Sequence, residues 1–271
     1  MFKKTFYYLV KVQYLGYRFH GWQKQPNLKT VHHMIDRTLK YVLVDQRFKT
    51  LGAGRTDAMV SANEAAFELF IYDEDLSDLE EFIKTFNENL PQDIRALSIV
   101  PVDKTFNVIQ DSKIKEYHYL FSQGAKNHPF CASIMTGIQQ ELDIDLMKKG
   151  AKLYEGTHNF KSYCYKPSET GLFERHLELS EIVDNDIYSA SFFPETSYVF
   201  RVRGKGFMRN QIRLMIGTLI NLGKGDLTLD DIANSLKADS QWQMNFVAPA
   251  SGLILHSVKF EEALKKASIL H

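Results

Sequence analysis

The chain has 271 residues, of which 44% are apolar and 24% charged, a composition typical of one large globular domain or two medium ones. Its 33 basic and 33 acidic side chains give a formal net charge of zero, which argues against a protein that coats nucleic acid through bulk charge. Cys131 and Cys164 lack CxxC spacing and a nearby histidine pair, so neither a disulfide scaffold nor a metal site is expected. Two cysteines of this kind are typical of a reducing compartment, and we expect a cytoplasmic location. No apolar run approaches the length of about 18 residues that a membrane span requires.

The first hundred residues predict five elements in the order β-α-β-α-β. Alternating apolar residues over 5–14 indicate a strand with one buried face, and Thr30 is a predicted N-cap before apolar residues at helical spacing. In chain order, the predicted elements are a strand over 5–14, a helix over 31–42, a strand over 65–72, a helix from a capping box at 77–80 to Pro91, and a strand over 94–102.

The remaining residues predict a second mixture of strands and helices. In chain order, these are a strand over 116–122, a helix over 146–154, a hairpin over 182–193 that turns at Asn185-Asp186, a strand over 198–203, a helix over 207–222, a short helix capped by Thr228, and a strand over 253–260. The sequence therefore predicts two α+β halves, residues 1–105 and 106–271, whose antiparallel sheets join.

Charge is segregated along the chain in spite of the balanced total. Residues 11–40 hold six basic side chains and one acid, and residues 201–213 hold five basic side chains and no acid, whereas residues 64–95 are strongly acidic. Aromatic residues flank both basic segments, a pattern that suits RNA binding but also an ordinary sheet with surface arginines. If the arginines after Gly204 bind phosphate, the basic segments line a positively charged cleft.

The segment 52–57, GAGRTD, is a predicted turn after a strand. Asp57 can be a carboxylate that merely stabilises this turn. Alternatively, Arg55 two residues earlier can keep Asp57 ionised and oriented, and an ionised carboxylate on a rigid turn can act as a nucleophile. Local chemistry leaves both readings open.

Five blocks together resemble a known family. They are YLGYRFHGWQKQ at 14–25, GAGRTDA at 52–58, KEYHY at 115–119, GFMRNQIRLMIG at 206–217 and APASGLIL at 248–255. Their content and order are similar to those of the TruA family of tRNA pseudouridine synthases. The joint match is more specific than any single block, and it favours a catalytic Asp57.

The resemblance implies a role for each matched residue. Asp57 would be the catalytic carboxylate, Tyr117 would stack on the uracil and take the C5 proton, and Arg213 would pair with Asp57. The positions expected to bind substrate are Arg55, Lys115, Gln23 and Arg209.

The resemblance also implies an activity and a fold. The enzyme would isomerise uridine to pseudouridine in the tRNA anticodon arm, at tRNA positions 38–40, as a homodimer and with no cofactor, metal or membrane. The implied fold is α+β, with two ferredoxin/RRM-like halves whose sheets join around a central basic cleft. The first half carries Asp57, and the second completes the RNA-binding surface.

Two segments depart from the family pattern. The chain has DAMVSA at 57–62 where the family often has DAGVHA, and FNVIQ at 106–110 where it often has FHARF. These departures motivate a second hypothesis, the same chemistry on ribosomal RNA. A noncatalytic RNA-binding paralogue is a third hypothesis, which the presence of Asp57, Tyr117 and Arg213 disfavours.

Overall fold

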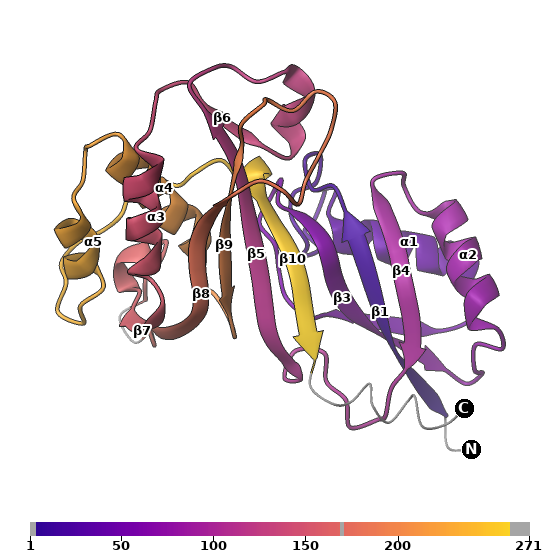
Figure 1. The fold of residues 1–271 in the computed structure, drawn as a ribbon. Coiled ribbons are helices and arrows are strands. Elements are labelled where there is room, and N and C mark those ends of the chain that lie inside the picture. The colour runs from indigo at the N-terminus through magenta and orange to yellow at the C-terminus, as the bar shows by residue number, and fades with distance from the viewer. Residues whose placement is uncertain (1–3, 169–170, 261–271) are drawn as a thin grey trace. The chain divides into compact units, whose positions relative to one another are not determined.

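The computed structural model describes residues 4–168 and 171–260 (Figure 1). The described residues form two compact units, one of residues 4–113 with 255–260 (unit 1) and one of residues 114–254 (unit 2). This grouping differs from a single division after residue 105, because the last strand, β10 (Leu253–Phe260), neighbours β3 (Ser61–Tyr72) in the sheet. Unit 1 is thus built from two separate stretches of sequence.

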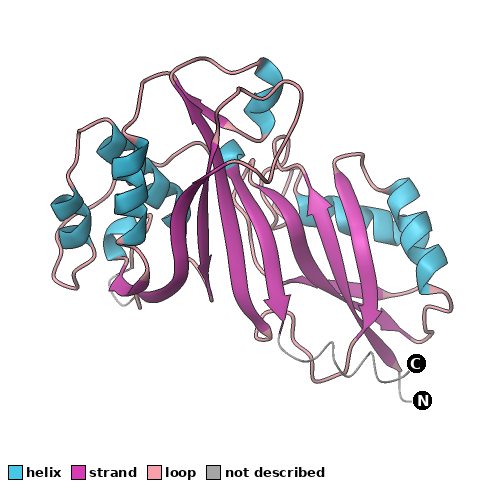
Figure 2. Cartoon of the chain, in the orientation of Figure 1, coloured by secondary structure: helices cyan, strands magenta, loops and turns pink. Residues whose placement is uncertain are grey.

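Unit 1 is a sheet with two helices on one side (Figure 2). Its strands have the order β4-β1-β3-β10, and β2 also pairs with β3. The pairs β1/β3, β1/β4 and β2/β3 are all antiparallel. The elements besides β3 and β10 are β1 (Thr5–Tyr14), α1 (Val31–Val42), β2 (Phe48–Gly52), α2 (Leu79–Asn89) and β4 (Ile94–Pro101).

The two helices of unit 1 begin at different kinds of cap. Thr30 caps α1 as predicted, since its side chain accepts the N–H of His33 at 3.3 Å. The predicted capping box at 77–80 is wrong. Asp78 caps α2 instead, because its carboxylate accepts the N–H groups of Glu80 and Glu81 at 2.9 and 3.0 Å. A carboxylate at this place also favours the positive end of the helix dipole.

The strands of unit 2 have the order β5-β9-β8-β7, in which β6 pairs with β5 in parallel and the pairs β5/β9, β8/β9 and β7/β8 are antiparallel. Helix α3 packs against α4, α5 and β8. The elements are β5 (Ser112–Gln123), β6 (Thr136–Ile138), α3 (Ile144–Lys152), β7 (Gly156–Asn159), β8 (Glu174–Asp184), β9 (Tyr198–Gly204), α4 (Gln211–Gly223) and α5 (Leu229–Ser235).

Two predictions for unit 2 are corrected by the structure. The hairpin predicted over 182–193 is absent, because β8 ends at Asp184 and a loop leads to β9. Asn185 closes that loop: its own N–H donates to Ser197 O at 2.9 Å, and its side chain accepts the N–H of Tyr188 at 2.9 Å. Helix α4 starts at Gln211 rather than at 207, since Asn210 adopts a left-handed conformation with φ 58°.

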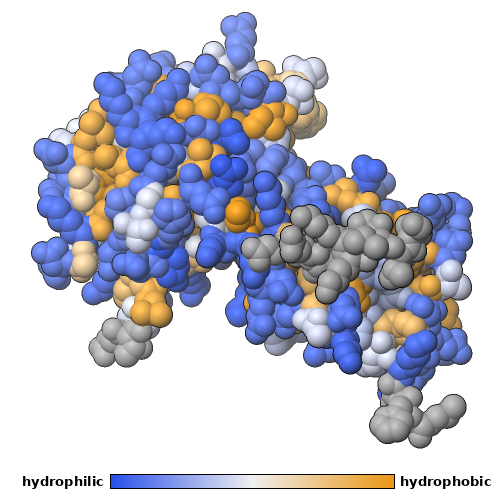
Figure 3. Space-filling model, turned by 60° about the horizontal axis from the view of Figure 1, so that its bottom comes forward, coloured by the Kyte–Doolittle hydropathy of each residue, from blue (hydrophilic) through white to orange (hydrophobic). Residues whose placement is uncertain are grey.

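Both units combine antiparallel strands with helices, which confirms the α+β class. The predicted central basic cleft remains a prediction. On the face shown in Figure 3, hydrophilic side chains predominate and apolar ones gather in separate patches. Within the described residues, no helix has both the length and the apolar character needed to cross a bilayer.

Candidate active site

Asp57 lies in unit 1, in the turn that connects β2 to β3. The turn is closed by the N–H of Val60, which donates to Asp57 O at 3.2 Å. Asp57 is half-buried, whereas Arg55 two residues earlier is exposed. The carboxylate is therefore partly withdrawn from water, while the guanidinium of Arg55 can reach a bound molecule.

The segment 14–22 holds this turn in place. The N–H of Trp22 donates to Thr56 O at 3.1 Å, and the N–H of Met59 donates to Phe19 O at 3.0 Å. The hydroxyls of Tyr14 and Thr56 are hydrogen-bonded at 2.9 Å. These bonds fix the turn on both sides of Asp57, so the first two sequence blocks form one structural assembly.

Two glycines of that segment allow it to lie directly against the turn. A Cβ on Gly16 would lie 2.0 Å from Val60 O, and a Cβ on Gly21 would lie 2.6 Å from Thr56 O. Gly21 also has a φ of +86°, which side chains disfavour. Any side chain at either position would push the backbone of the Asp57 turn away.

Met59 occupies the position at which the family pattern often has glycine. Its φ is 67°, the left-handed conformation that glycine adopts most easily. A non-glycine residue in this region costs about 1 kcal/mol or more, and the hydrogen bond to Phe19 O offsets part of that cost. The departure in DAMVSA is thus accommodated without losing the turn.

A buried histidine, His32, stacks against the ring of Trp22. The rings of Trp22 and His32 are stacked, with centroids 5.6 Å apart, and Trp22 lies over Gly52, where a Cβ would come within 2.3 Å of its Nε1. His32 Nε2 is 2.7 Å from Thr50 Oγ1, which donates to Asp36 Oδ1 at 2.6 Å. Burial lowers the pKa of His32, although Asp36 opposes that shift.

Tyr117 and Lys115 lie on β5 in unit 2, on the same face because they are two residues apart. The half-buried ring of Tyr117 meets Phe207 edge to face, with centroids 5.3 Å apart. Lys115 lies opposite Gly204 on β9, and burial lowers the pKa of its ammonium group. A tyrosine held by an aromatic edge is a suitable platform for an unstacked base.

Arg213 lies on the first turn of α4. Its Nε donates to Ala248 O at 2.7 Å, and the N–H of Ala248 donates back to Arg213 O at 3.1 Å. The hydroxyl of the fully buried Tyr119 donates to Pro249 O at 2.9 Å. The block at 248–255 is therefore hydrogen-bonded to both α4 and β5, so three of the blocks are in direct contact.

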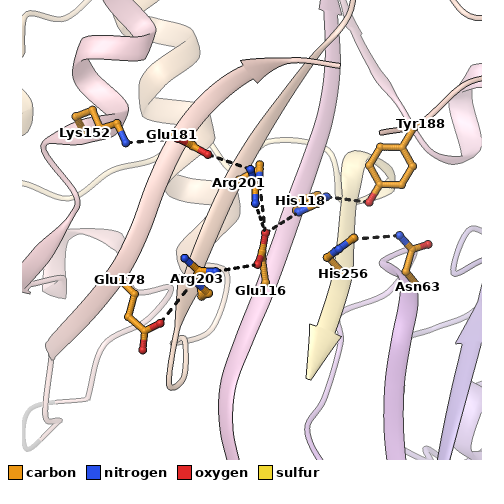
Figure 4. Close-up of polar contacts among 10 residues, drawn as sticks. All are labelled: Asn63, Glu116, His118, Lys152, Glu178, Glu181, Tyr188, Arg201, Arg203 and His256. Carbon is orange, nitrogen blue, oxygen red and sulfur yellow. Dashed lines mark hydrogen bonds and ion pairs between the residues drawn. The ribbon is translucent and has the colours of Figure 1, made fainter. Parts of the chain in front are cut away.

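The second basic segment is only partly available to bind phosphate. Arg201 donates to the buried Glu116 at 3.0 Å and to Glu181 at 3.1 Å, and Arg203 lies 3.6 Å from Glu116 (Figure 4). Burial alone would raise the pKa of Glu116, but hydrogen bonds from His118 and Arg201 outweigh it and lower the pKa. Arg201 and Arg203 are therefore paired with acids of neighbouring strands, which leaves the arginines after Gly204 as the candidates for binding phosphate.

The other predicted binding residues lie at the surface. Gln23 is exposed and follows Trp22, which anchors the turn of Asp57. Arg209 is exposed four residues before Arg213, and its guanidinium lies 5.1 Å from the ring centroid of Tyr165. The sequence does not predict a role for Tyr165, because no short pattern links Tyr165 to Arg209. No group of three or more potential metal ligands occurs among the described residues.

The chain is similar in sequence to known proteins. A family model described as tRNA pseudouridine synthase matches residues 151–261. The tRNA pseudouridine synthase A of Staphylococcus aureus strain MRSA252 is 31% identical over 255 residues, which cover 94% of this chain and 92% of the relative. That of strain JH1 is 30% identical, over 94% of this chain and 91% of the relative. The chain therefore belongs to the TruA family of tRNA pseudouridine synthases.

Proposed function

We propose that the protein converts uridine to pseudouridine in the anticodon arm of tRNA, at tRNA positions 38–40. The observation that carries this proposal is the turn of Asp57, which hydrogen bonds with Tyr14, Phe19 and Trp22 fix on both sides. Such rigidity suits a catalytic carboxylate, because small displacements of a reacting group cost large factors in rate.

In this reaction the N1–C1′ bond of uridine breaks, the uracil turns, and a C5–C1′ bond forms. The C5 proton then leaves, and N1 gains a proton, so the change is an isomerisation that needs no oxidant. Asp57 supplies the carboxylate, and Arg213 stabilises its charge. Tyr117 stacks on the extruded uracil and accepts the C5 proton. The positive charge of Lys115 assists this step, because it favours the ionised form of the Tyr117 hydroxyl.

Four further residues take part in substrate binding. Arg55 fills the space that the extruded nucleotide leaves, and Gln23, Lys115 and Arg209 contact the RNA. The protein acts as a homodimer in the cytoplasm, with one tRNA contacting both subunits. Sedimentation equilibrium of the full chain tests the dimer, since a monomer at micromolar concentration contradicts it.

The activity is tested by the release of tritium from RNA labelled at C5 of uridine. Unmodified tRNA should release tritium to water, whereas release from ribosomal RNA alone would support the rRNA alternative. Binding of tRNA without release from either RNA would support a noncatalytic paralogue.

Asp57→Asn removes the carboxylate at nearly constant size, so it should abolish release while tRNA affinity stays within about tenfold. The matched control is Asp45→Asn, which changes an exposed aspartate of the same unit and should retain full release. Full activity of Asp57→Asn would refute the catalytic role.

A further inference from the structure

An exposed tyrosine in unit 2 lies between two cations. Tyr165 is 38% exposed, although it follows directly after buried residues. The guanidinium of Arg209 is 5.1 Å from its ring centroid, and the ammonium of Lys166 is 5.5 Å away. These distances are within the range of cation–π attraction. The three side chains form what is called here the Tyr165 cluster.

The backbone beneath the Tyr165 cluster is firmly anchored. The N–H of Tyr165 donates to Arg209 O at 3.2 Å, so the two segments that supply the cluster are joined directly. Just before it, the Ser162 hydroxyl donates to Ser235 O at 2.8 Å, and the Tyr163 hydroxyl is 2.7 Å from Ser235 Oγ. The exposed side chains therefore project from a fixed base.

The charges of this cluster are not neutralised by acids in the part of the chain that the structure describes. Arg201 and Arg203 of the same basic segment pair with Glu116, as described above. By contrast, neither Arg209 nor Lys166 has a carboxylate partner among residues 4–168 and 171–260. Both side chains are exposed, so an anion in solution can approach them.

We infer that the Tyr165 cluster binds a phosphodiester group of the RNA backbone. The guanidinium of Arg209 can bind two phosphate oxygens, and Lys166 adds a second charge. The ring of Tyr165 restricts the orientations of Arg209 before RNA binds, which lowers the entropy cost of forming the contact. This inference rests on the proposed function, because it takes RNA as the ligand.

The position of the cluster indicates which phosphate is bound. Arg213 follows Arg209 by four residues and lies on the first turn of α4. Because Arg213 acts at the target uridine in the proposed function, the phosphate on Arg209 belongs to a nucleotide close to the target in the strand.

The test measures the dissociation constant of the full chain for an unmodified tRNA transcript over a series of salt concentrations. Arg209→Gln should weaken binding about tenfold and reduce the slope of log K against log salt by about 0.7 to 0.9, the effect of one lost phosphate contact. Tyr165→Leu should weaken binding about threefold, whereas Tyr165→Phe keeps a ring and should bind like the wild type.

The matched control is Lys224→Gln. Lys224 lies 6.0 Å from the ring of Phe246, which is also exposed, so it is a second cation–aromatic pair in the same unit. Lys224→Gln should leave the tRNA affinity and the salt slope unchanged. An equal loss in Lys224→Gln and Arg209→Gln would overturn the inference, because the effect would then be one of general charge.

The double variant Tyr165→Leu/Arg209→Gln tests whether the ring acts through the guanidinium. It should bind within about twofold of Arg209→Gln alone, and fully additive losses would refute this role of the ring. Tritium release is measured in parallel. If release persists while Arg209→Gln and Tyr165→Leu bind normally, the inference fails and the proposed function stands. If no RNA releases tritium but the predicted affinity losses occur, the cluster stands and the catalytic proposal fails.

Discussion

Gly16→Ala should slow catalysis although Gly16 is not itself proposed to touch the substrate. A Cβ at this position would lie 2.0 Å from Val60 O and 2.3 Å from Val60 C, and both atoms belong to the backbone. Contacts below 3.0 Å essentially never occur, so the Val60 carbonyl must retreat by about 1 Å. Val60 is hydrogen-bonded to Asp57 across the turn, and the carboxylate must therefore move as well.

A misplacement of about 1 Å in a catalytic group costs roughly 10²-fold in rate, which corresponds to about 2.7 kcal/mol of activation free energy. The overpacking should also lower the free energy of unfolding by about 1–3 kcal/mol. Single-turnover tritium release from C5-labelled tRNA, with enzyme in excess, isolates the chemical step from RNA binding. Thermal unfolding of the same variant measures the loss of stability.

A control for lost stability is Gly150→Ala in unit 2. Its Cβ would lie 2.4 Å from Leu222 Cδ2, so this variant overpacks a core without contact to the turn of Asp57. It should keep a normal single-turnover rate below its unfolding temperature. If Gly16→Ala is folded and releases tritium within about twofold of the wild-type rate, the argument that this glycine positions Asp57 is refuted.

Three further changes test the supports of the site. Tyr14→Phe removes the hydrogen bond to Thr56, worth about 1 kcal/mol, and should lower the single-turnover rate about fivefold with little change in tRNA affinity; an unchanged rate contradicts this. Glu116→Gln should lower the free energy of unfolding by about 2 kcal/mol at neutral pH, because Arg201 loses its charged partner. The lowered pKa of Glu116 adds stability that is present above its usual value of 4.5 and is lost as the pH falls through the folded value, so the variant should show a flatter acid limb in chemical denaturation. Burial also lowers the pKa of His32, so its contribution to the free energy of unfolding is complete above pH 6.5 and is lost as the pH falls through the folded pKa. His32→Gln should therefore lose less thermal stability between neutral pH and about pH 5 than the wild type does. An equal loss in both proteins would refute this assignment.

Local patterns predicted the regular elements well where a cap and a periodicity agree. Helix α1 begins and ends as predicted, because Thr30 and the apolar spacing both mark it. The start of helix α4 was predicted four residues too early, because apolar periodicity cannot reveal that Asn210 adopts a left-handed conformation. The hairpin at 182–193 was wrong because Asn185 is a turn residue whose side chain closes a longer loop.

The site was only partly predictable for a different reason. The blocks identified the turn of Asp57, but the contacts of Thr56 with Tyr14 and Trp22 depend on packing between segments more than 30 residues apart. Similarly, the acids that neutralise Arg201 come from β5 and β8, so a count of charges along one segment overstated the cations available to RNA. Local spacing cannot supply such information.

The return of β10 to unit 1 has a consequence for the order of folding during synthesis. Residues 114–254 are contiguous and can fold as soon as they leave the ribosome. Unit 1 carries Asp57 but lacks the strand beside β3 until residues 255–260 emerge, among them Leu255 and Val258, which are buried, and Phe260, whose ring contacts Phe106. The strand pairing of unit 1 is thus completed only after the whole of unit 2 has been synthesised, and until then β3 lacks β10 as its neighbour.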